Sequence, residues 1–353
     1  MIPVERQLYQ TKEPQRHRYL PGKTRAGQIK TGSLPLVSIV TPAYNEEEYL
    51  AQCIESIRAQ TYSNWDYTIV NNLSTDKTLE IAETYAASDP RIRICTNEAF
   101  VPALANFNNA FRQISPNSKY CKMVLADDWI FPECLERMVA AMEEHPSAGI
   151  GGAYGLAERW VVWMGLPYPS DLVSGREVCR RRLLGGPYVF GSPTSVLFRS
   201  DLVRRRDPFY NESNTAADSE ACFELLKSCD FSFVHQVLTF SRDERSGSRL
   251  AASRKLNTLA ADILHELIAY GPYYLTPEEY TNCLRVRLAS YYDFLAASFL
   301  DGRNREFWDY HKRRLREEGV KFEASRVAYM LAKKLLSKFR RTGRGRSKDQ
   351  WGL

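Results

Sequence analysis

Three polar turns carry the residue types that could do chemistry in this chain. The segment CKMVLADDWIFPE (121–133) places the adjacent carboxylates Asp127 and Asp128 directly after an apolar run. The turns TPAYNE (41–46) and NNLSTD (71–76) each follow another apolar run. Two neighbouring carboxylates repel each other, whereas a hard divalent cation such as Mg²⁺ or Mn²⁺ is bound by one or two carboxylates together with phosphate oxygens. The three turns therefore indicate a site for a nucleotide bound with a divalent cation.

Apolar periodicity predicts the elements that position these turns. Val37–Val40 is a β-branched run typical of a buried parallel strand, and a helical apolar stripe follows it. Asn45 and Glu48 are spaced as a capping box for that helix. The segment 65–88 repeats the order strand, polar turn, helix. Strands that alternate with helices indicate an α/β fold with a mostly parallel sheet, in which the carboxyl ends of the strands share one edge.

The chain of 353 residues is long enough for one large domain and an appendage. Residues 1–34 are polar, basic and interrupted by proline and glycine, which predicts a flexible N-terminal tail. Residues 35–245 carry the alternating pattern and are expected to form the α/β domain. Residues 246–353 have helical periodicity and predict a helical C-terminal extension, which ends in the basic segment KKLLSKFRRTGRGRSK (333–348).

Composition excludes several classes of protein. The formal net charge is +6, and the eight cysteines are scattered without a CxxC pair, which argues against a disulfide framework or a zinc site. The first residues lack the apolar core of a signal peptide, and no stretch approaches about 20 apolar residues, so a cytoplasmic protein is expected. Neither early turn carries GxGxxG, which argues against a dinucleotide-dependent oxidoreductase. No nucleic-acid-binding module is recognisable, so no nucleic acid is expected as a partner.

Three segments occur in order along the chain: PLVSIVTPAYNEEEYLAQCIESIRAQTY, IVNNLSTDKT and MVLADDWIFPECLERM. Their order and spacing resemble the family 2 glycosyltransferases of the GT-A fold, and the similarity extends from about residue 35 to 245. The resemblance implies a Rossmann-like sheet flanked by helices and a metal-dependent enzyme. It also implies transfer of a sugar from a nucleotide-diphosphate donor to a hydroxyl of a glycan or lipid-linked acceptor, usually with inversion, as in the assembly of cell-surface polysaccharides or glycolipids.

The resemblance assigns roles to positions in the first two turns. Thr41, Ala43, Tyr44 and Glu46 stand where the family lines the nucleoside pocket. Asn72 stands where relatives commonly carry an aspartate that faces the base. An amide in that place keeps an acceptor oxygen and adds N–H donors, so the preferred nucleotide stays open.

The resemblance also assigns the acids. Asp127 and Asp128 occupy the family's metal-binding motif, and Asp127 is expected to contact the nucleotide as well. Asp218, in NTAADSEACFELL, stands at the place of the catalytic base, which takes the proton from the attacking hydroxyl. The chain departs from the family at Leu125 and Ala217, where many relatives carry further acids. The metal would therefore depend on a single pair of carboxylates.

Other interpretations stay open at several positions. Asp127 and Asp128 also fit a cap and a solvated charge before the next helix, and Asp218 also fits a helix N-cap. Arg242 and Arg245 fit either a contact with the diphosphate or a charged surface loop. The basic C-terminal helix fits either the inner face of a membrane or packing on the catalytic domain. The alternative function is a non-catalytic nucleotide-sugar-binding or scaffold protein of the same fold.

Overall fold

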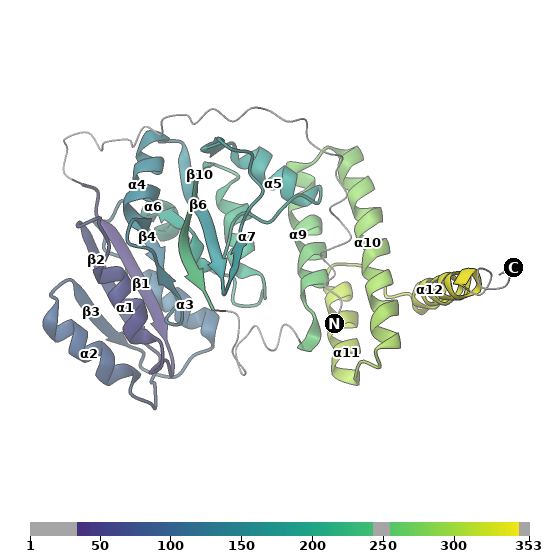
Figure 1. The fold of residues 1–353 in the computed structure, drawn as a ribbon, viewed down its shortest axis with the longest axis horizontal. Coiled ribbons are helices and arrows are strands. Elements are labelled where there is room, and N and C mark those ends of the chain that lie inside the picture. The colour runs from purple at the N-terminus through teal and green to yellow at the C-terminus, as the bar shows by residue number, and fades with distance from the viewer. Residues whose placement is uncertain (1–33, 243–254, 346–353) are drawn as a thin grey trace, which may run out of the picture.

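A ten-stranded sheet lies at the centre of the computed structural model, which describes residues 34–242 and 255–345 (Figure 1). The strands are β1 (Val37–Ala43), β2 (Trp65–Asn71), β3 (Ile92–Thr96), β4 (Tyr120–Met123), β5 (Trp129–Ile130), β6 (Ala148–Ala157), β7 (Trp160–Val162), β8 (Leu172–Val173), β9 (Leu197–Arg199) and β10 (Asp230–Ser241). In space they follow the order β3-β2-β1-β4-β9-β6-β10-β5, with β7 paired to β6 and β8 paired to β10. The longest pairings, β1–β2, β2–β3 and β6–β10, are parallel, which confirms the predicted α/β fold.

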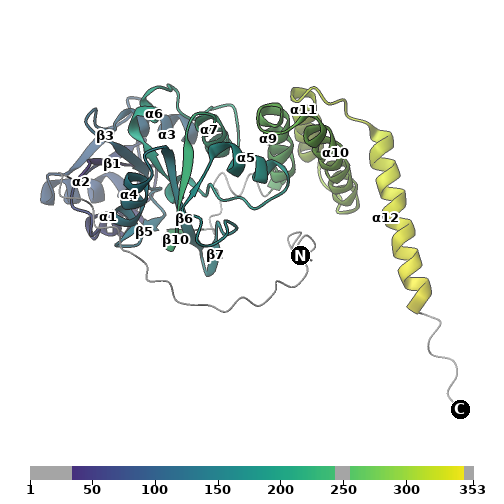
Figure 2. The same ribbon diagram turned by 90° about the horizontal axis from the view of Figure 1, so that it is seen from above.

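Helices cover both faces of this sheet and then continue beyond it. They are α1 (Leu50–Arg58), α2 (Thr78–Ser88), α3 (Ala103–Arg112), α4 (Cys134–Glu144), α5 (Gly175–Leu183), the 3-10 turn η2 (Pro193–Ser195), α6 (Ser200–Arg204), α7 (Ala217–Leu225), α9 (Leu259–Tyr274), α10 (Pro277–Leu300), α11 (Arg305–Glu317) and α12 (Ala324–Gly345). Figure 2 shows α3 and α7 on one face of the sheet and α1 and α4 on the other. The order of elements therefore buries both faces of the strands, as their continuous apolar runs require.

The register of the strands brings the predicted polar turns to one edge. Ala43 at the end of β1 lies opposite Asn71 at the end of β2. Val40 in β1 lies opposite Met123, the last residue of β4. Strand β5 follows the acidic turn and pairs antiparallel with β10, which brings the carboxyl end of β10 to the same edge. This edge is where ligands bind in open α/β sheets.

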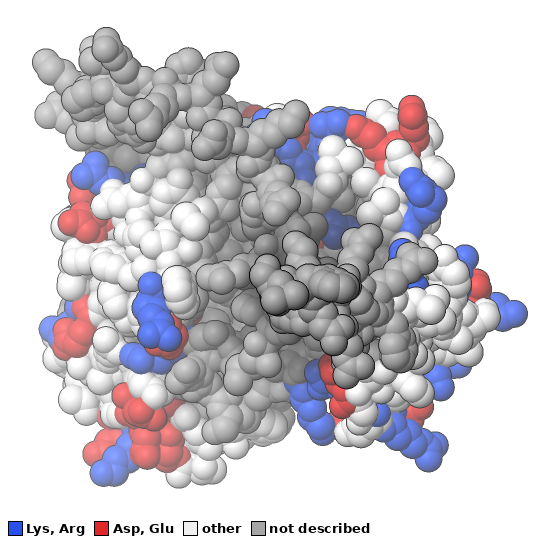
Figure 3. All heavy atoms as spheres, turned by 45° about the vertical axis from the view of Figure 1, so that its right-hand side comes forward, with Lys and Arg blue, Asp and Glu red and all other residues white. Residues whose placement is uncertain are grey.

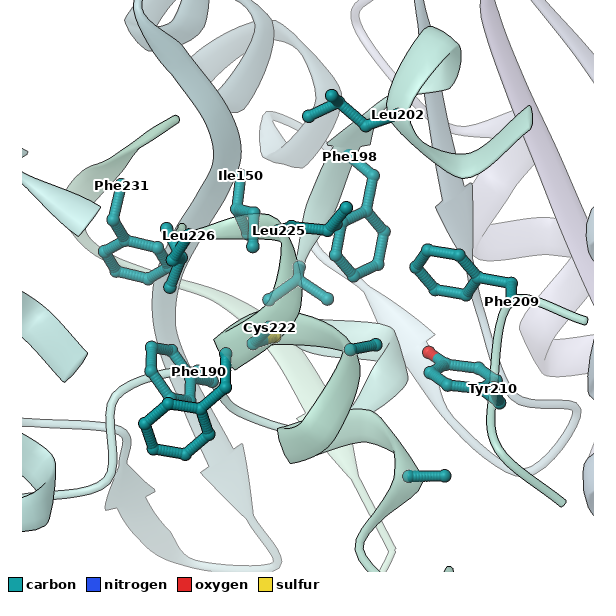
Figure 4. Packing of buried hydrophobic residues seen from close by; sticks show 14 of the residues in the cluster. Ile150, Phe190, Phe198, Leu202, Phe209, Tyr210, Cys222, Leu225, Leu226 and Phe231 are labelled. Carbon is teal, nitrogen blue, oxygen red and sulfur yellow. The ribbon is translucent and has the colours of Figure 1, made fainter. Parts of the chain in front are cut away.

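The hydrophobic core beside α7 continues into the C-terminal helices. Figure 4 shows aromatic and aliphatic side chains of this core, among them Phe190 and Phe231, packed around α7. On the same helix, Phe223 stacks on Tyr270 of α9 with ring centroids 4.8 Å apart. Tyr274 of α9 donates a hydrogen bond to the Phe223 carbonyl (2.5 Å). Helix α9 thus shares a core with the sheet. The predicted boundary at residue 245 and all but the last residue of the predicted tail 1–34 lie outside the described residues.

The predicted capping box at the start of the first helix is wrong. Helix α1 begins at Leu50, and no side chain caps it. Asn45 instead has a positive φ of 53°, which asparagine tolerates better than most residues. Its Oδ1 accepts a hydrogen bond from the amide of Thr75 (2.8 Å) in the second turn. A tertiary contact therefore takes the side chain that the local pattern assigned to the helix.

Candidate active site at the carboxyl edge of the sheet

The first two turns are joined to each other by hydrogen bonds. The amide of Glu46 donates to Thr78 Oγ1 (2.6 Å), and the amide of Glu47 donates to Asp76 Oδ2 (3.1 Å). Glu46, one of the predicted nucleoside-pocket residues, is partly buried in this junction. Backbone groups of one turn bind side chains of the other, so the two turns hold one fixed relative position.

Two of the predicted nucleotide-binding residues are buried in the sheet. Thr41 and Ala43 have almost no exposed surface. The Thr41 hydroxyl donates to the Val124 carbonyl (2.7 Å) and accepts a hydrogen bond from Tyr67 (2.8 Å). The threonine side chain therefore fastens β1 to the start of the acidic turn and is not directed at a ligand.

Tyr44 and Asn72 contact the loop 97–101, whose role the sequence did not indicate. Tyr44 is exposed, and its ring packs against Phe100, with centroids 4.8 Å apart. Asn72 is buried, and its Oδ1 accepts hydrogen bonds from the amide of Val101 (3.1 Å) and from Asn97 Nδ2 (2.8 Å). The Asn72 side chain thus holds the segment that carries Phe100 next to Tyr44. No local pattern signalled Phe100, because it lies in a loop without periodicity.

The two acids of the acidic turn lie in different environments. Asp127 is partly exposed, whereas Asp128 is buried. Asp128 Oδ2 accepts hydrogen bonds from the hydroxyls of Thr194 (2.5 Å) and Ser241 (3.3 Å). Asp128 Oδ1 accepts one from the backbone amide of Arg242 (3.1 Å). Three protein donors therefore compensate the Asp128 carboxylate, whereas the Asp127 carboxylate lies partly exposed at the same edge.

Burial dominates the electrostatics around Asp128. Burial, and then the charge of Asp127, raise the pKa of Asp128 to about 7 despite the three hydrogen bonds. Behind it lies Lys122, a fully buried lysine of β4, whose pKa is lowered by burial. Its ammonium donates to the carbonyls of Thr194 (2.6 Å) and Val196 (3.3 Å). Lys122 thus fixes the turn η2 that presents the Thr194 hydroxyl to Asp128.

The acidic turn does not cap the helix that follows it. Helix α4 begins at Cys134, and no side chain donates or accepts a capping hydrogen bond there. The two acids are separated from α4 by β5, which begins at Trp129. The Trp129 indole stacks on Phe240 of β10, with ring centroids 4.9 Å apart. The tryptophan after the acids therefore packs between strands and holds the turn in place.

Asp218 lies in the first turn of α7, one residue after the helix begins at Ala217. No side chain caps this helix, so the N-cap interpretation of Asp218 is wrong. Asp218 is partly buried. Burial, and then the charge of Asp218, raise the pKa of Tyr188 well above its usual range, so Asp218 lies close to that ring. The residue after it, Ser219, donates to the buried carboxylate of Glu266 on α9 (2.7 Å).

The loop 188–195 connects Asp128 of the acidic turn with the neighbourhood of Asp218. The Tyr188 hydroxyl, near Asp218, donates to the carbonyl of Gly191 (3.2 Å). The next residue, Ser192, shares a hydrogen bond with Ser241 (3.3 Å), and Ser241 binds Asp128. The alternating pattern is less regular over residues 150–217, yet this region supplies the residues that join Asp128 to the neighbourhood of Asp218.

Arg242 reaches the same edge through its side chain. Its guanidinium carbon lies 4.1 Å from the ring centroid of Tyr49, and Nη2 donates to Gln52 Oε1. The cation is thus held over the segment between the first turn and α1. Arg245 lies outside the described residues.

The donor set fits a cation that depends on its substrate for most of its ligands. In the described ranges 34–242 and 255–345, no group of three or more His, Cys, Asp and Glu side chains could by itself hold a metal ion. Mg²⁺ commonly uses one or two carboxylates plus substrate phosphates. Asp127 and the remaining acceptor position on Asp128 meet that requirement, and the metal-binding prediction stays a prediction.

A cavity of about 380 Å³ lies at the opposite ends of the strands. Its lining includes Tyr120 and Ala148, the first residues of β4 and β6. Ligands of open α/β sheets bind at the carboxyl ends, so this cavity is separate from the candidate site.

Residues 38–206 match the model of the family Glycosyl transferase family 2. The glycosyltransferase GlyG of Streptococcus pneumoniae is 30% identical over 225 residues, which cover 60% of this chain and 72% of that protein. The chain belongs to glycosyltransferase family 2. EpsE of Bacillus subtilis is 38% identical over 158 residues, which cover 42% of this glycosyltransferase family member and 56% of EpsE. The chain thus spans just over half the length of that relative.

The fold of this family 2 chain resembles a solved glycosyltransferase structure as well. The structure of S. aureus TarS 1-349 in complex with UDP-GlcNAc aligns with a TM-score of 0.54 and 20% sequence identity, covering 73% of each chain. At this identity the likeness concerns the fold, and it confirms the predicted GT-A architecture.

Proposed function

We propose that the chain is an inverting glycosyltransferase that moves a sugar from a nucleoside-diphosphate donor to an acceptor hydroxyl in cell-surface polysaccharide or glycolipid assembly. One observation carries the proposal: three protein donors fix Asp128, and Asp127 stands partly exposed beside it at the edge where β1, β2 and β4 end. A turn built in this way holds one carboxylate for a ligand without requiring two adjacent charges to be solvated.

Asp127 is proposed as the direct ligand of a divalent cation, and Asp128 as its positioning neighbour with one acceptor site left. When bound, Mg²⁺ or Mn²⁺ would neutralise the charge of the departing diphosphate. The fixed Asp128 backbone limits the positions that the Asp127 carboxylate can take. Arg242, held over Tyr49, is proposed to contact the diphosphate from the other side, together with Arg245.

The nucleoside is proposed to lie along the first two turns. The exposed ring of Tyr44 and its partner Phe100 offer a surface on which a base stacks. The backbone of Thr41 and Ala43 lines the inner side, while Asn72 acts by holding the Phe100 segment. Asn72 keeps this role with any base, so the nucleotide is selected elsewhere in the pocket.

Asp218 is proposed as the catalytic base. Its place in the first turn of α7 favours the ionised carboxylate, because the N-terminal end of a helix is electropositive. An ionised carboxylate accepts the proton of the acceptor hydroxyl as that oxygen attacks the anomeric carbon and the diphosphate leaves. Inversion follows from such a single displacement.

The C-terminal helix is proposed to lie on an anionic membrane surface at the inner face of the cell membrane. No helix in the described part of the chain is long and apolar enough to cross a membrane. Residues 324–348 contain nine Lys and Arg and no Asp or Glu. Helix α12 extends away from the sheet (Figure 2) and exposes Tyr329, Leu335 and Leu336. On the face seen in Figure 3, basic and acidic side chains of the described residues occur side by side, so the basic segment 324–348 would provide the net attraction. Equal binding to neutral and anionic vesicles would rule this surface out.

The test is calorimetric titration with UDP, GDP, dTDP and CDP, each with and without Mn²⁺, followed by turnover with the matching sugar nucleotides. Asp127→Asn should lose at least about tenfold of the metal-dependent affinity, which corresponds to about 1.4 kcal/mol. Asp218→Asn should keep that affinity and lose about 10²–10⁴ in turnover. Asp309→Asn, a largely exposed acid on α11, is the matched control. Failure of every nucleotide to bind the wild-type chain would refute the proposal. Tight binding without turnover would support the scaffold alternative.

A further inference from the structure

The segment after β6 turns back as β7 and exposes large apolar side chains. Trp160 is 68% exposed, Tyr168 is 63% exposed and Met164 is 56% exposed. These three exposed side chains fall within nine residues of the chain, and large apolar side chains exposed together can mark a place where something binds. The proposed chemistry at Asp127 and Asp218 uses none of these three side chains.

The hairpin formed by β6 and β7 is held in place by the packing of Trp163. Trp163 packs edge-on against Tyr188, with ring centroids 5.7 Å apart. Its indole nitrogen is buried and has no hydrogen-bond partner among the described residues. Gly155 makes room for it, since a Cβ at this glycine would lie 2.9 Å from that nitrogen. Burying an unpaired donor costs about 1–3 kcal/mol, so packing fixes this tryptophan against a penalty.

The Tyr168 ring is also held by packing, in this case against β10. Its ring meets the edge of His235 on β10, with centroids 5.4 Å apart. Both ring nitrogens of His235 are engaged, one with the Tyr154 hydroxyl (2.7 Å) and one with the Ser170 carbonyl (2.7 Å). The exposed Tyr168 ring is thus held against a histidine that is itself fixed at both nitrogens, which reduces the entropy lost when a ligand binds.

The hairpin begins next to the acidic turn. The amide of Glu158, at its tip, donates to the carbonyl of Ser241 (3.3 Å), and the Ser241 hydroxyl donates to Asp128 (3.3 Å). On its other side the Trp163 ring contacts Tyr188, which lies near Asp218. The hairpin therefore lies next to Asp128 of the acidic turn and near Asp218, the proposed base.

We infer that Trp160, Met164 and Tyr168 form a platform on which sugar rings of the acceptor glycan stack. This inference rests on the proposed function and names the surface that presents the attacking hydroxyl. A reacting hydroxyl has to approach within about 3–3.5 Å of its target, so the neighbouring sugar units must lie on the surface that adjoins the acids. Flat, rigid aromatic rings give large contact area at low entropic cost, and the charged Arg159 beside Trp160 can bind sugar hydroxyls.

The experiment measures saccharide binding by tryptophan fluorescence and by ligand-observed NMR. The probes are cellohexaose, chitohexaose, maltohexaose and mannohexaose, each with the full chain. Trp160→Ala and Tyr168→Ala should each weaken binding of the recognised saccharide by about tenfold, whereas Trp160→Phe should keep most of it. Phe299→Ala removes an equally exposed ring from α10 and should change nothing. Equal melting temperatures would show that all variants are folded.

Several results would overturn the inference. One is that none of the four saccharides binds the wild-type chain, and another is that the two alanine variants bind like the wild type. A third is that these variants lose binding to phosphatidylcholine–phosphatidylglycerol vesicles and keep saccharide binding, which would make the platform a lipid contact. Titration with UDP and GDP in the same samples separates this inference from the proposed function. Nucleotide binding without saccharide binding would overturn the platform alone, and the reverse result would support the platform and refute the transferase.

Discussion

Asp128→Asn is the substitution for which the structure gives the sharpest expectation. The amide has the shape of the carboxylate, and its oxygen can keep the hydrogen bond from the Arg242 amide. Its NH₂ group then faces the hydroxyls of Thr194 and Ser241, which can rotate to accept. The substitution therefore removes a buried charge with little change in packing.

The pKa of Asp128 determines how the free energy of unfolding depends on pH. Burial, and then the Asp127 charge, raise this pKa from a usual value of 3.8 to about 7. Between these values the folded state binds more protons than the unfolded state, so the free energy of unfolding falls as the pH rises. At about 1.4 kcal/mol per pKa unit, the wild type loses about 4 kcal/mol between pH 4 and pH 7 through this group. Asp128→Asn has no titrating group at this position and therefore lacks this pH-dependent contribution to the free energy of unfolding.

The assay is thermal and urea unfolding of wild type and Asp128→Asn at pH 5, 6, 7 and 8 in chelator, which keeps divalent cations away. The variant should become progressively more stable relative to the wild type as the pH rises. From pH 5 upward this group accounts for about 3 kcal/mol, so at roughly 2–4 °C per kcal/mol the relative melting temperature should move by about 6–12 °C. Asp127→Asn should shift the wild-type transition to lower pH, because it removes the neighbouring charge. Parallel pH curves for wild type and Asp128→Asn would refute the reasoning.

Two further predictions concern the C-terminal helices. Leu267→Ala on α9 should lower the free energy of unfolding by about 2–5 kcal/mol, because Leu267 is buried in the core shared with α7. The control Leu259→Ala, at an exposed position of α9, should change the free energy of unfolding by less than about 0.5 kcal/mol. Equal effects in urea unfolding would show that α9 is not part of that core. Burial lowers the pKa of His311 from 6.5 to about 4, so its folded state binds fewer protons and stability should be lost as the pH falls from 6.5 towards 4. The melting temperature of His311→Phe should depend less on pH over this window than that of the wild type, and an identical dependence would contradict the assignment.

Much of the site could be located from the sequence because its parts are local. The apolar runs predicted strands, and the polar turns after them fall at one edge because parallel strands align their carboxyl ends. The order of the turns also identified the family, which the comparisons confirm. The sequence did not determine what each individual side chain contacts. Thr41 was predicted to line the nucleoside pocket, but its hydroxyl donates to the Val124 carbonyl inside the sheet.

The amino-acid sequence by itself determined the α/β fold, the three turns and the presence of two adjacent acids, since these follow from local periodicity and residue type. Only the tertiary structure decided how the acids differ. The donors to Asp128 come from Thr194, Ser241 and Arg242, which lie 66 to 114 residues further along the chain. No local pattern encodes partners at such separations, because they meet only when η2 and the end of β10 pack against the acidic turn. That packing holds Asp128 buried and leaves Asp127 partly exposed.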